Sequence, residues 1–274
     1  MGALIFVKRP AEPKSALVTE PVHTESPQKI QIGNSVEERA INAYTYGNGA
    51  THLVFVGGIH GGYEWNSVLL AYTLKEYLDK NPKTIPDALT ISIIPSANPD
   101  GIYKVFGKEY PFTASDAPKK AETVVGRFNA HNVDLNRNFD CKWQPESTWQ
   151  SKKVSAGSSP FSEPEAQAIR KFVSDTHPRA VVFWHSQSNA IYASECENGI
   201  LPETLAIMNV YAKSAGYPAV ESFDAYAITG DAEGWLASIG IPAITVELKT
   251  HETIEWQQNL AGVTALFEYY AREK

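Results

Sequence analysis

The stretch THLVFVGGIHGGYEW at residues 51–65 decides the fold and contains the first candidate site residues. Its first part, Thr51 to Gly58, is rich in β-branched and aromatic residues and closes on two glycines, which is typical of a buried strand. From about Glu64 to Leu78 apolar residues recur at helical spacing, and the pattern stops before Pro82, which predicts a helix. A buried strand that leads directly into a helix is typical of α/β proteins.

The same alternation continues on both sides of this stretch. Apolar patterns predict a hairpin from Ile30 to Gly47, and further strands at Ala88–Pro95, Ala180–His185 and Pro242–Leu248. Helices are expected at Leu201–Ser214 and Ile254–Ala271. The sequence therefore predicts one α/β domain with a mostly parallel, mixed and twisted sheet, helices on both faces, and an active site at the carboxyl ends of the strands.

Two segments of the chain do not follow this alternation. Residues 1–27 carry four prolines without a strand or helix period, which predicts an extended arm or tether before one domain over residues 28–274. Residues 96–157 are expected to be largely irregular, and long loops inside a compact domain are usually functional. A helix is expected to follow, with Ser162 as its cap and Glu165 completing a capping box.

Composition excludes some classes of protein. The formal net charge is −7, and the 24 basic residues form no run, which argues against a nucleic-acid partner. The apolar run Ala3–Val7 is far shorter than the ~20 residues that cross a bilayer. We therefore expect no membrane-spanning segment, and no signal peptide is visible.

His60 and Glu64 are the first candidates for chemistry, because they lie at the turn between the first buried strand and its helix. A single pair of this kind is weak evidence. Six further motifs accompany it in order: GNSVEERAI from Gly33, NPDG from Asn98, NVDLNRNF from Asn132, SPFSEPEAQ from Ser159, WHSQS around His185 and TVEL ending at Leu248. In this order they resemble the zinc carboxypeptidase family, the funnelins, in a bacterial-type form.

The resemblance implies that His60, Glu64 and His185 hold one zinc ion, a two-histidine, one-glutamate set that leaves a position for water. The family usually has two residues between the first histidine and the glutamate, whereas this chain has three. Gly61 and Gly62 would allow the loop to bulge. Four other histidines, His52, His131, His177 and His251, match no ligand position and are expected to be surface or ordinary polar residues.

Roles for further residues follow from the same resemblance. Glu247 would be the general base that takes a proton from water and returns it to the leaving amine. Arg127 would stabilise the developing oxyanion. Arg137, with Asn136 beside it, would bind the terminal carboxylate of a peptide substrate, for which a planar guanidinium offers two parallel hydrogen bonds. Tyr226, nine residues before Trp235, would close over the substrate.

Substrate preference is predicted from spacing. Glu233 lies seven residues after Tyr226, at the position that resembles the family's specificity residue, and Asp231 adds negative charge. A confined carboxylate left without a partner favours a cation. We therefore expect a preference for a C-terminal residue with a cationic side chain, namely Lys, Arg or diaminopimelate, over Leu or Phe.

The two cysteines, Cys141 and Cys196, follow Arg137 and His185 by a few residues. Loops that leave one pocket can bring their sulfurs together, so a disulfide and an exported protein, in the periplasm, the cell envelope or outside the cell, are expected. The expected function is zinc-dependent cleavage of a C-terminal residue, with cell-wall peptides among the substrates considered. The alternatives are a zinc-dependent deacylase of N-acyl amino acids and a non-catalytic peptide-binding module.

Overall fold

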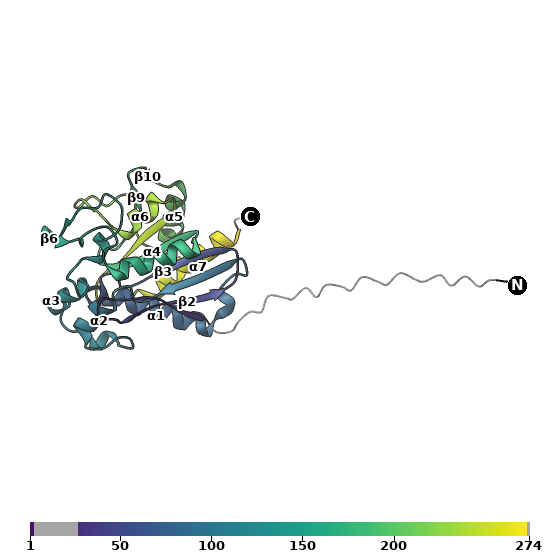
Figure 1. Cartoon of the computed structure of the whole chain (residues 1–274), viewed down its shortest axis with the longest axis horizontal. Coiled ribbons are helices and arrows are strands. Elements are labelled where there is room, and N and C mark those ends of the chain that lie inside the picture. Colours follow the sequence, from purple (N-terminus) through teal and green to yellow (C-terminus); the bar gives the residue numbers. More distant parts are fainter. Residues whose placement is uncertain (3–26, 273–274) are drawn as a thin grey trace.

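The computed structural model describes residues 1–2 and 27–272 of the chain. The arm expected over residues 1–27 therefore falls almost wholly outside the described residues. Figure 1 shows that the described part forms one α/β body in which helices lie on a central sheet. The predicted fold class is confirmed.

An eight-stranded sheet has the order β1-β2-β4-β3-β7-β12-β8-β11. The strands are β1 (Gln28–Asn34), β2 (Ala40–Gly47), β3 (Thr51–Val56), β4 (Leu89–Ile94), β7 (Ala180–Ser186), β8 (Ala190–Ala193), β11 (Ala219–Val220) and β12 (Ala243–Leu248). The four central strands β4, β3, β7 and β12 run parallel, whereas β1, β2 and β8 add antiparallel pairs. The sheet is thus mixed and mostly parallel, as the apolar runs of its central strands predict.

Period-two alternation along the central strands builds two cores, one on each face of the sheet. In β3, Leu53 and Phe55 contribute to one cluster, and Val54 and Val56 to the other. The first cluster packs under α1 (Trp65–Lys80), α5 (Pro202–Ala215) and α7 (Trp256–Arg272). The second packs under α4 (Pro164–Thr176) and α6 (Ala232–Ser238). Both faces are covered, as expected.

The long segment after β4 is less irregular than expected. It contains α2 (Pro99–Phe106), the short α3 (Lys120–Thr123), and a hairpin of β5 (Glu146–Trp149) and β6 (Lys152–Ser155). The side chain of Asn98 accepts a hydrogen bond from the Gly101 amide and caps α2, so this motif begins a helix rather than forming an isolated turn.

The predicted capping box at Ser162 was wrong. Helix α4 begins at Pro164, and no side chain caps its first turn. The Ser162 hydroxyl donates to Glu163 Oε1 at 2.8 Å, and Glu165 accepts from the backbone amide of Val36 at 3.1 Å and from Asn129. Glu165 is fully buried and faces the β1–β2 turn, so its carboxylate bonds to these distant groups rather than to the first turn of α4.

The predicted disulfide is present. Cys141 and Cys196 are bonded, with their Cα atoms 6.1 Å apart, and Cys196 belongs to the short hairpin of β9 (Glu195–Cys196) and β10 (Gly199–Ile200). Among the described residues, no helix combines the length and apolar character needed to cross a membrane.

Candidate active site

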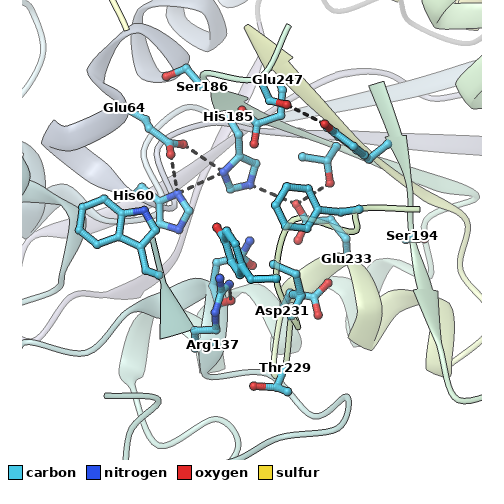
Figure 2. A pocket seen from close by; sticks show the side chains of 18 of the residues that line it. His60, Glu64, Arg137, His185, Ser186, Ser194, Thr229, Asp231, Glu233 and Glu247 are labelled. Carbon is cyan, nitrogen blue, oxygen red and sulfur yellow. Dashed lines mark hydrogen bonds and ion pairs between the residues drawn. The ribbon is translucent and has the colours of Figure 1, made fainter. Parts of the chain in front are cut away.

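A cavity of about 640 Å³ opens at the carboxyl ends of β7 and β12. Helix α6 and the loops that carry the predicted motifs form its walls (Figure 2). All residues predicted for the site line it: His60, Glu64, Arg127, Asn136, Arg137, His185, Tyr226, Asp231, Glu233 and Glu247. Residues from distant parts of the chain therefore meet in one place, where parallel strands end.

His60, Glu64 and His185 converge on one point (Figure 2), and we call them the metal triad. His60 Nδ1 lies 2.8 Å from Glu64 Oε1, His185 Nδ1 lies 3.0 Å from Glu64 Oε2, and the two Nδ1 atoms are 3.2 Å apart. All three side chains are buried. Two imidazole nitrogens that face each other beside a carboxylate are the donor set that a zinc ion takes, so these residues fit the metal.

Two further carboxylates lie on the outer sides of the histidines. His185 Nε2 is 3.1 Å from Glu233 Oε1 and makes a hydrogen bond. His60 Nε2 is 3.3 Å from Asp134 Oδ1, but its orientation leaves this contact electrostatic rather than hydrogen-bonded. A carboxylate behind a histidine fixes the ring and leaves the opposite nitrogen free for a metal. Burial lowers the pKa of His185, but the charges of Glu64 and Glu233 outweigh it and raise the pKa well above its usual value.

The extra residue between His60 and Glu64 is accommodated by a short 3₁₀ turn over Gly61–Glu64. Gly61 has a φ of 41°, and a Cβ atom there would lie 2.7 Å from the carbonyl oxygen of Gly126. At Gly62 a Cβ atom would lie 2.5 Å from the carbonyl oxygen of Gly101. Only glycine fits both positions, which explains how the longer loop still brings Glu64 to the triad.

Arg127 is buried at the edge of the triad. Its Nε and a terminal nitrogen lie 2.9 and 2.8 Å from Asp134 Oδ2, while the other terminal nitrogen is 3.7 Å from Glu64 Oε1. Its guanidinium stacks 4.5 Å from the ring of Trp149. These contacts fix the side chain and leave one edge of it directed toward the triad.

Arg137 is also buried, but its charge has no direct counterion. It donates to the carbonyl oxygens of Asn136 at 2.6 Å and of Thr148 at 3.3 Å, and its Nε has no hydrogen-bond partner. No carboxylate in the described part of the chain forms an ion pair with it. A buried guanidinium in this state can bind an anion.

Asn136 and Glu233 have more internal contacts than expected. The Asn136 side chain accepts from the backbone amide of Ala232 at 2.9 Å and hydrogen-bonds Glu233. Glu233 also accepts from Thr245 at 3.1 Å, in addition to its bond with His185. The premise that the Glu233 carboxylate is unpartnered in its pocket was therefore wrong, because α6 directs it at a metal-triad histidine.

Asp231 caps α6 by accepting from the backbone amide of Gly234 at 2.7 Å. Burial, followed by the charge of Glu233, raises the pKa of Asp231 to about 6. Only one of its oxygens accepts this capping bond, and the side chain is half-buried at the cavity wall. Asp231, unlike Glu233, makes no contact with a histidine of the metal triad.

Glu247 pairs in register with His185 across β12 and β7, so both side chains project from the same face of the sheet. Burial, together with the negative charge of Glu64, raises the pKa of Glu247 to about 8. Its Oε2 atom is buried and has no hydrogen-bond partner. Such a carboxylate can hold and release a proton near neutral pH.

Tyr226 lies in the segment 221–229 and lines the same cavity as the metal triad. Its ring is half-buried and contacts Phe223 edge to face, with 4.9 Å between centroids. Burial raises the pKa of its phenol, which keeps the hydroxyl protonated and able to donate. The segment is attached by a hydrogen bond between Ser147 and Thr229.

His251 was expected to be a surface or ordinary polar residue, and the structure instead places it in the cavity wall. Its side chain is 4% exposed, lines the cavity and contacts Ser186 and the ring of Tyr63. The sequence signal that could have found it is its position four residues after Glu247, in the loop that leaves the same strand end.

Known proteins share both sequence and fold with this chain. A gamma-D-glutamyl-L-diamino acid endopeptidase from Lysinibacillus sphaericus is 27% identical over 245 residues, covering 81% of this chain and 60% of that protein. Bovine thrombin-activatable fibrinolysis inhibitor has a TM-score of 0.69 at 21% identity, with 90% of this chain and 88% of that chain covered. Murein-tripeptide amidase from Escherichia coli O157 has a TM-score of 0.63 at 21% identity, with coverage of 94% and 99%.

The two structural likenesses show a shared fold, and the chain spans about 60% of the length of the Lysinibacillus relative. The family model described as zinc carboxypeptidase matches residues 20–258. That match includes every residue of the cavity wall. Because it spans most of the chain, this chain belongs to the zinc carboxypeptidase family of metallopeptidases.

Proposed function

We propose that this protein is a zinc-dependent carboxypeptidase that hydrolyses the last peptide bond of its substrate. Arg137 is the observation that carries the proposal. It is a buried guanidinium with an unpartnered Nε, it lines the same cavity as the metal triad, and no acid of the described residues pairs with it. A free terminal carboxylate would supply the missing anion, and this requirement selects the end of a peptide over its interior.

The metal triad and Glu247 would have different roles in the reaction. Zinc, held by His60, Glu64 and His185, would supply a Lewis acid that polarises the scissile carbonyl and acidifies a water molecule. Glu247 would take the proton of that water on its unpartnered Oε2 and later return it to the leaving amine. A bound cation would bring the pKa of Glu247 down from its raised value, toward the range in which it can do both.

Arg127 and Tyr226, which line the same cavity, would both act on the substrate. Arg127 is held by Asp134, so its free edge is already oriented toward the place where negative charge develops on the carbonyl oxygen. The Tyr226 hydroxyl would donate to the bound peptide and help exclude water as the segment 221–229 closes.

The same cavity would prefer a C-terminal residue with a cationic side chain. Asp231 lines it, and only one of its carboxylate oxygens is used by the capping bond. The Lysinibacillus relative is named for a diamino acid, a residue that carries a second amine. Cell-wall peptides with such residues are therefore a substrate class to test, and the disulfide supports an exported protein, since disulfides persist in oxidising compartments.

The test compares catalytic efficiency on peptides that end in Lys, diaminopimelate or Leu. The zinc-loaded enzyme should favour the first two by about tenfold or more, because their side-chain amine would place a positive charge beside the Asp231 carboxylate. Asp231→Asn should reduce that preference, and amidating the peptide terminus should abolish hydrolysis of all three. Cleavage of amidated peptides, or activity only on N-acyl amino acids, would contradict the carboxypeptidase assignment.

A further inference from the structure

The wall of the cavity opposite Arg137 contains a chain of hydrogen bonds that the proposed reaction does not use. Ser186 and Arg137 lie on opposite sides of the metal triad (Figure 2). The Ser186 hydroxyl is 3.0 Å from Asn66 Oδ1 and 2.7 Å from His251 Nδ1. All three side chains are buried.

The direction of each bond in this chain is determined. Asn66 Nδ2 donates to the carbonyl oxygens of Thr250 at 2.7 Å and Thr253 at 2.9 Å, which uses both of its hydrogens. Asn66 Oδ1 is therefore the acceptor, and the single hydroxyl hydrogen of Ser186 goes to it. Ser186 Oγ must then accept from His251, so the proton of the imidazole is on Nδ1.

This assignment leaves His251 Nε2 with a lone pair. Burial lowers the pKa of His251 to about 4, so the ring is neutral at physiological pH. The ring is held against Tyr63, with 4.5 Å between centroids, and no group in the described part of the chain hydrogen-bonds Nε2. The cavity therefore contains a fixed hydrogen-bond acceptor beside the metal triad, on the side away from Arg137.

We propose that His251 Nε2 accepts a hydrogen bond from a nitrogen donor on the acyl side of the scissile bond, and so forms a binding subsite for the part of the peptide that precedes the removed residue. The inference rests on the proposed function: with the terminal carboxylate at Arg137 and the scissile carbonyl at the triad, the preceding residue must lie toward Ser186 and His251. Its nitrogen is either a main-chain amide or a free amine, and both can donate to a neutral imidazole.

The test uses three substrates that differ at one position, on the residue before the scissile bond. That residue carries an acylated amide with an N–H, an ester oxygen in its place, or a free amine. The wild-type enzyme should favour at least one N–H substrate over the ester by about tenfold in kcat/KM, the typical effect of one hydrogen bond. Whichever N–H substrate loses more in the variants identifies the natural donor.

Two substitutions separate the nitrogen atoms of the ring. His251→Asn keeps a donor to Ser186 but has no acceptor at the Nε2 position. Its kcat/KM on the N–H substrates should therefore exceed that on the ester by no more than about twofold. His251→Gln places an amide oxygen near the Nε2 position and should retain part of the preference. His131→Phe, at an exposed histidine outside the cavity, should keep all of it. Binding of the same substrates to Glu247→Gln protein should follow the same order.

A wild-type enzyme that does not distinguish amide or amine from ester would overturn the subsite, as would an unchanged preference in His251→Asn. Failure of the proposed function has a different signature: none of the three substrates is hydrolysed by the zinc-loaded protein. Because the wild-type comparison needs no variant, poor folding of a substituted protein does not prevent the test.

Discussion

Asp134 and Glu233 lie behind the two histidines of the metal triad, on the sides away from the convergent Nδ1 atoms. Both are buried, so the free-energy cost of burying their charges must be offset by the groups that they contact. Asp134 also holds Arg127, and Glu233 also holds Thr245. Each carboxylate thus connects a triad histidine to a second residue, and each should influence metal binding without touching the metal.

Glu233→Gln should weaken zinc binding by about 10–100-fold, because an amide orients His185 less firmly and no longer raises its basicity. The measurement is a zinc dissociation constant from competition with a chelator. Asp231→Asn is the matched control two residues away, since Asp231 caps α6 and does not contact the histidine. Equal zinc affinity in wild type and Glu233→Gln would show that this carboxylate does not support His185.

Glu247→Gln should keep its zinc and lose about 10²–10⁴-fold in kcat, because an amide cannot accept a proton from water or return it to the amine. Zinc content by elemental analysis and turnover on a peptide substrate, measured on the same sample, separate the two effects. If turnover survives, another residue is the base.

At the scale of elements, the turn between β3 and α1 determines whether the triad can form. It makes a 3₁₀ turn over Gly61–Glu64, packed against α2 and the segment containing Gly126. The close approach of backbone to backbone, rather than side-chain packing, gives this turn its shape. Glycine is required there for two separate reasons, a positive φ and lack of space.

A pair of substitutions separates these two reasons. Gly107 has a φ of 64°, and a Cβ atom there would have nothing within 4 Å. Gly107→Ala should therefore lower the free energy of unfolding only by the cost of holding alanine in a left-handed backbone conformation, about 1–2 kcal/mol. Gly61→Ala adds a contact of 2.7 Å with the Gly126 carbonyl and should destabilise more, with loss of zinc. Urea unfolding and zinc content report both. Similar free energies for the two variants would argue against the steric explanation.

At the scale of the whole molecule, the disulfide joins the loop after Arg137 to the β9–β10 hairpin across 55 residues of chain. These two segments form part of the cavity rim, together with residues that begin α6. The bond therefore restricts the unfolded chain and keeps two walls of the cavity together in the folded protein.

Replacing both Cys141 and Cys196 with Ala should lower the free energy of unfolding by about 4 kcal/mol, as expected for closure of a loop of this length. Urea unfolding of the zinc-loaded wild-type and double-variant proteins gives the difference. Zinc content should stay the same, because neither sulfur contacts the metal triad. An unchanged unfolding midpoint would mean that the disulfide constrains little of the denatured state.

The sequence by itself determined strands β1, β2, β3, β4, β7 and β12, helices α1, α4, α5 and α7, and the motif residues, because these depend on local patterns. Period-two and helical spacing mark which side chains are buried, and β-branched runs such as 51–56 have few alternatives to a central strand. The metal triad was predicted as three positions whose geometry the structure then supplied. The disulfide followed from two loops that leave one pocket.

Only the tertiary structure decided how the remaining polar groups are partnered. Glu233 meets His185 across 48 residues of sequence, and His251 meets Ser186 across 65. Glu165 gives up the expected capping box for partners on the β1–β2 turn. The physical reason is common to all three. A buried polar atom needs a hydrogen-bond partner, and the packing of separate elements decides which partner lies within reach. Local sequence carries no information about that packing.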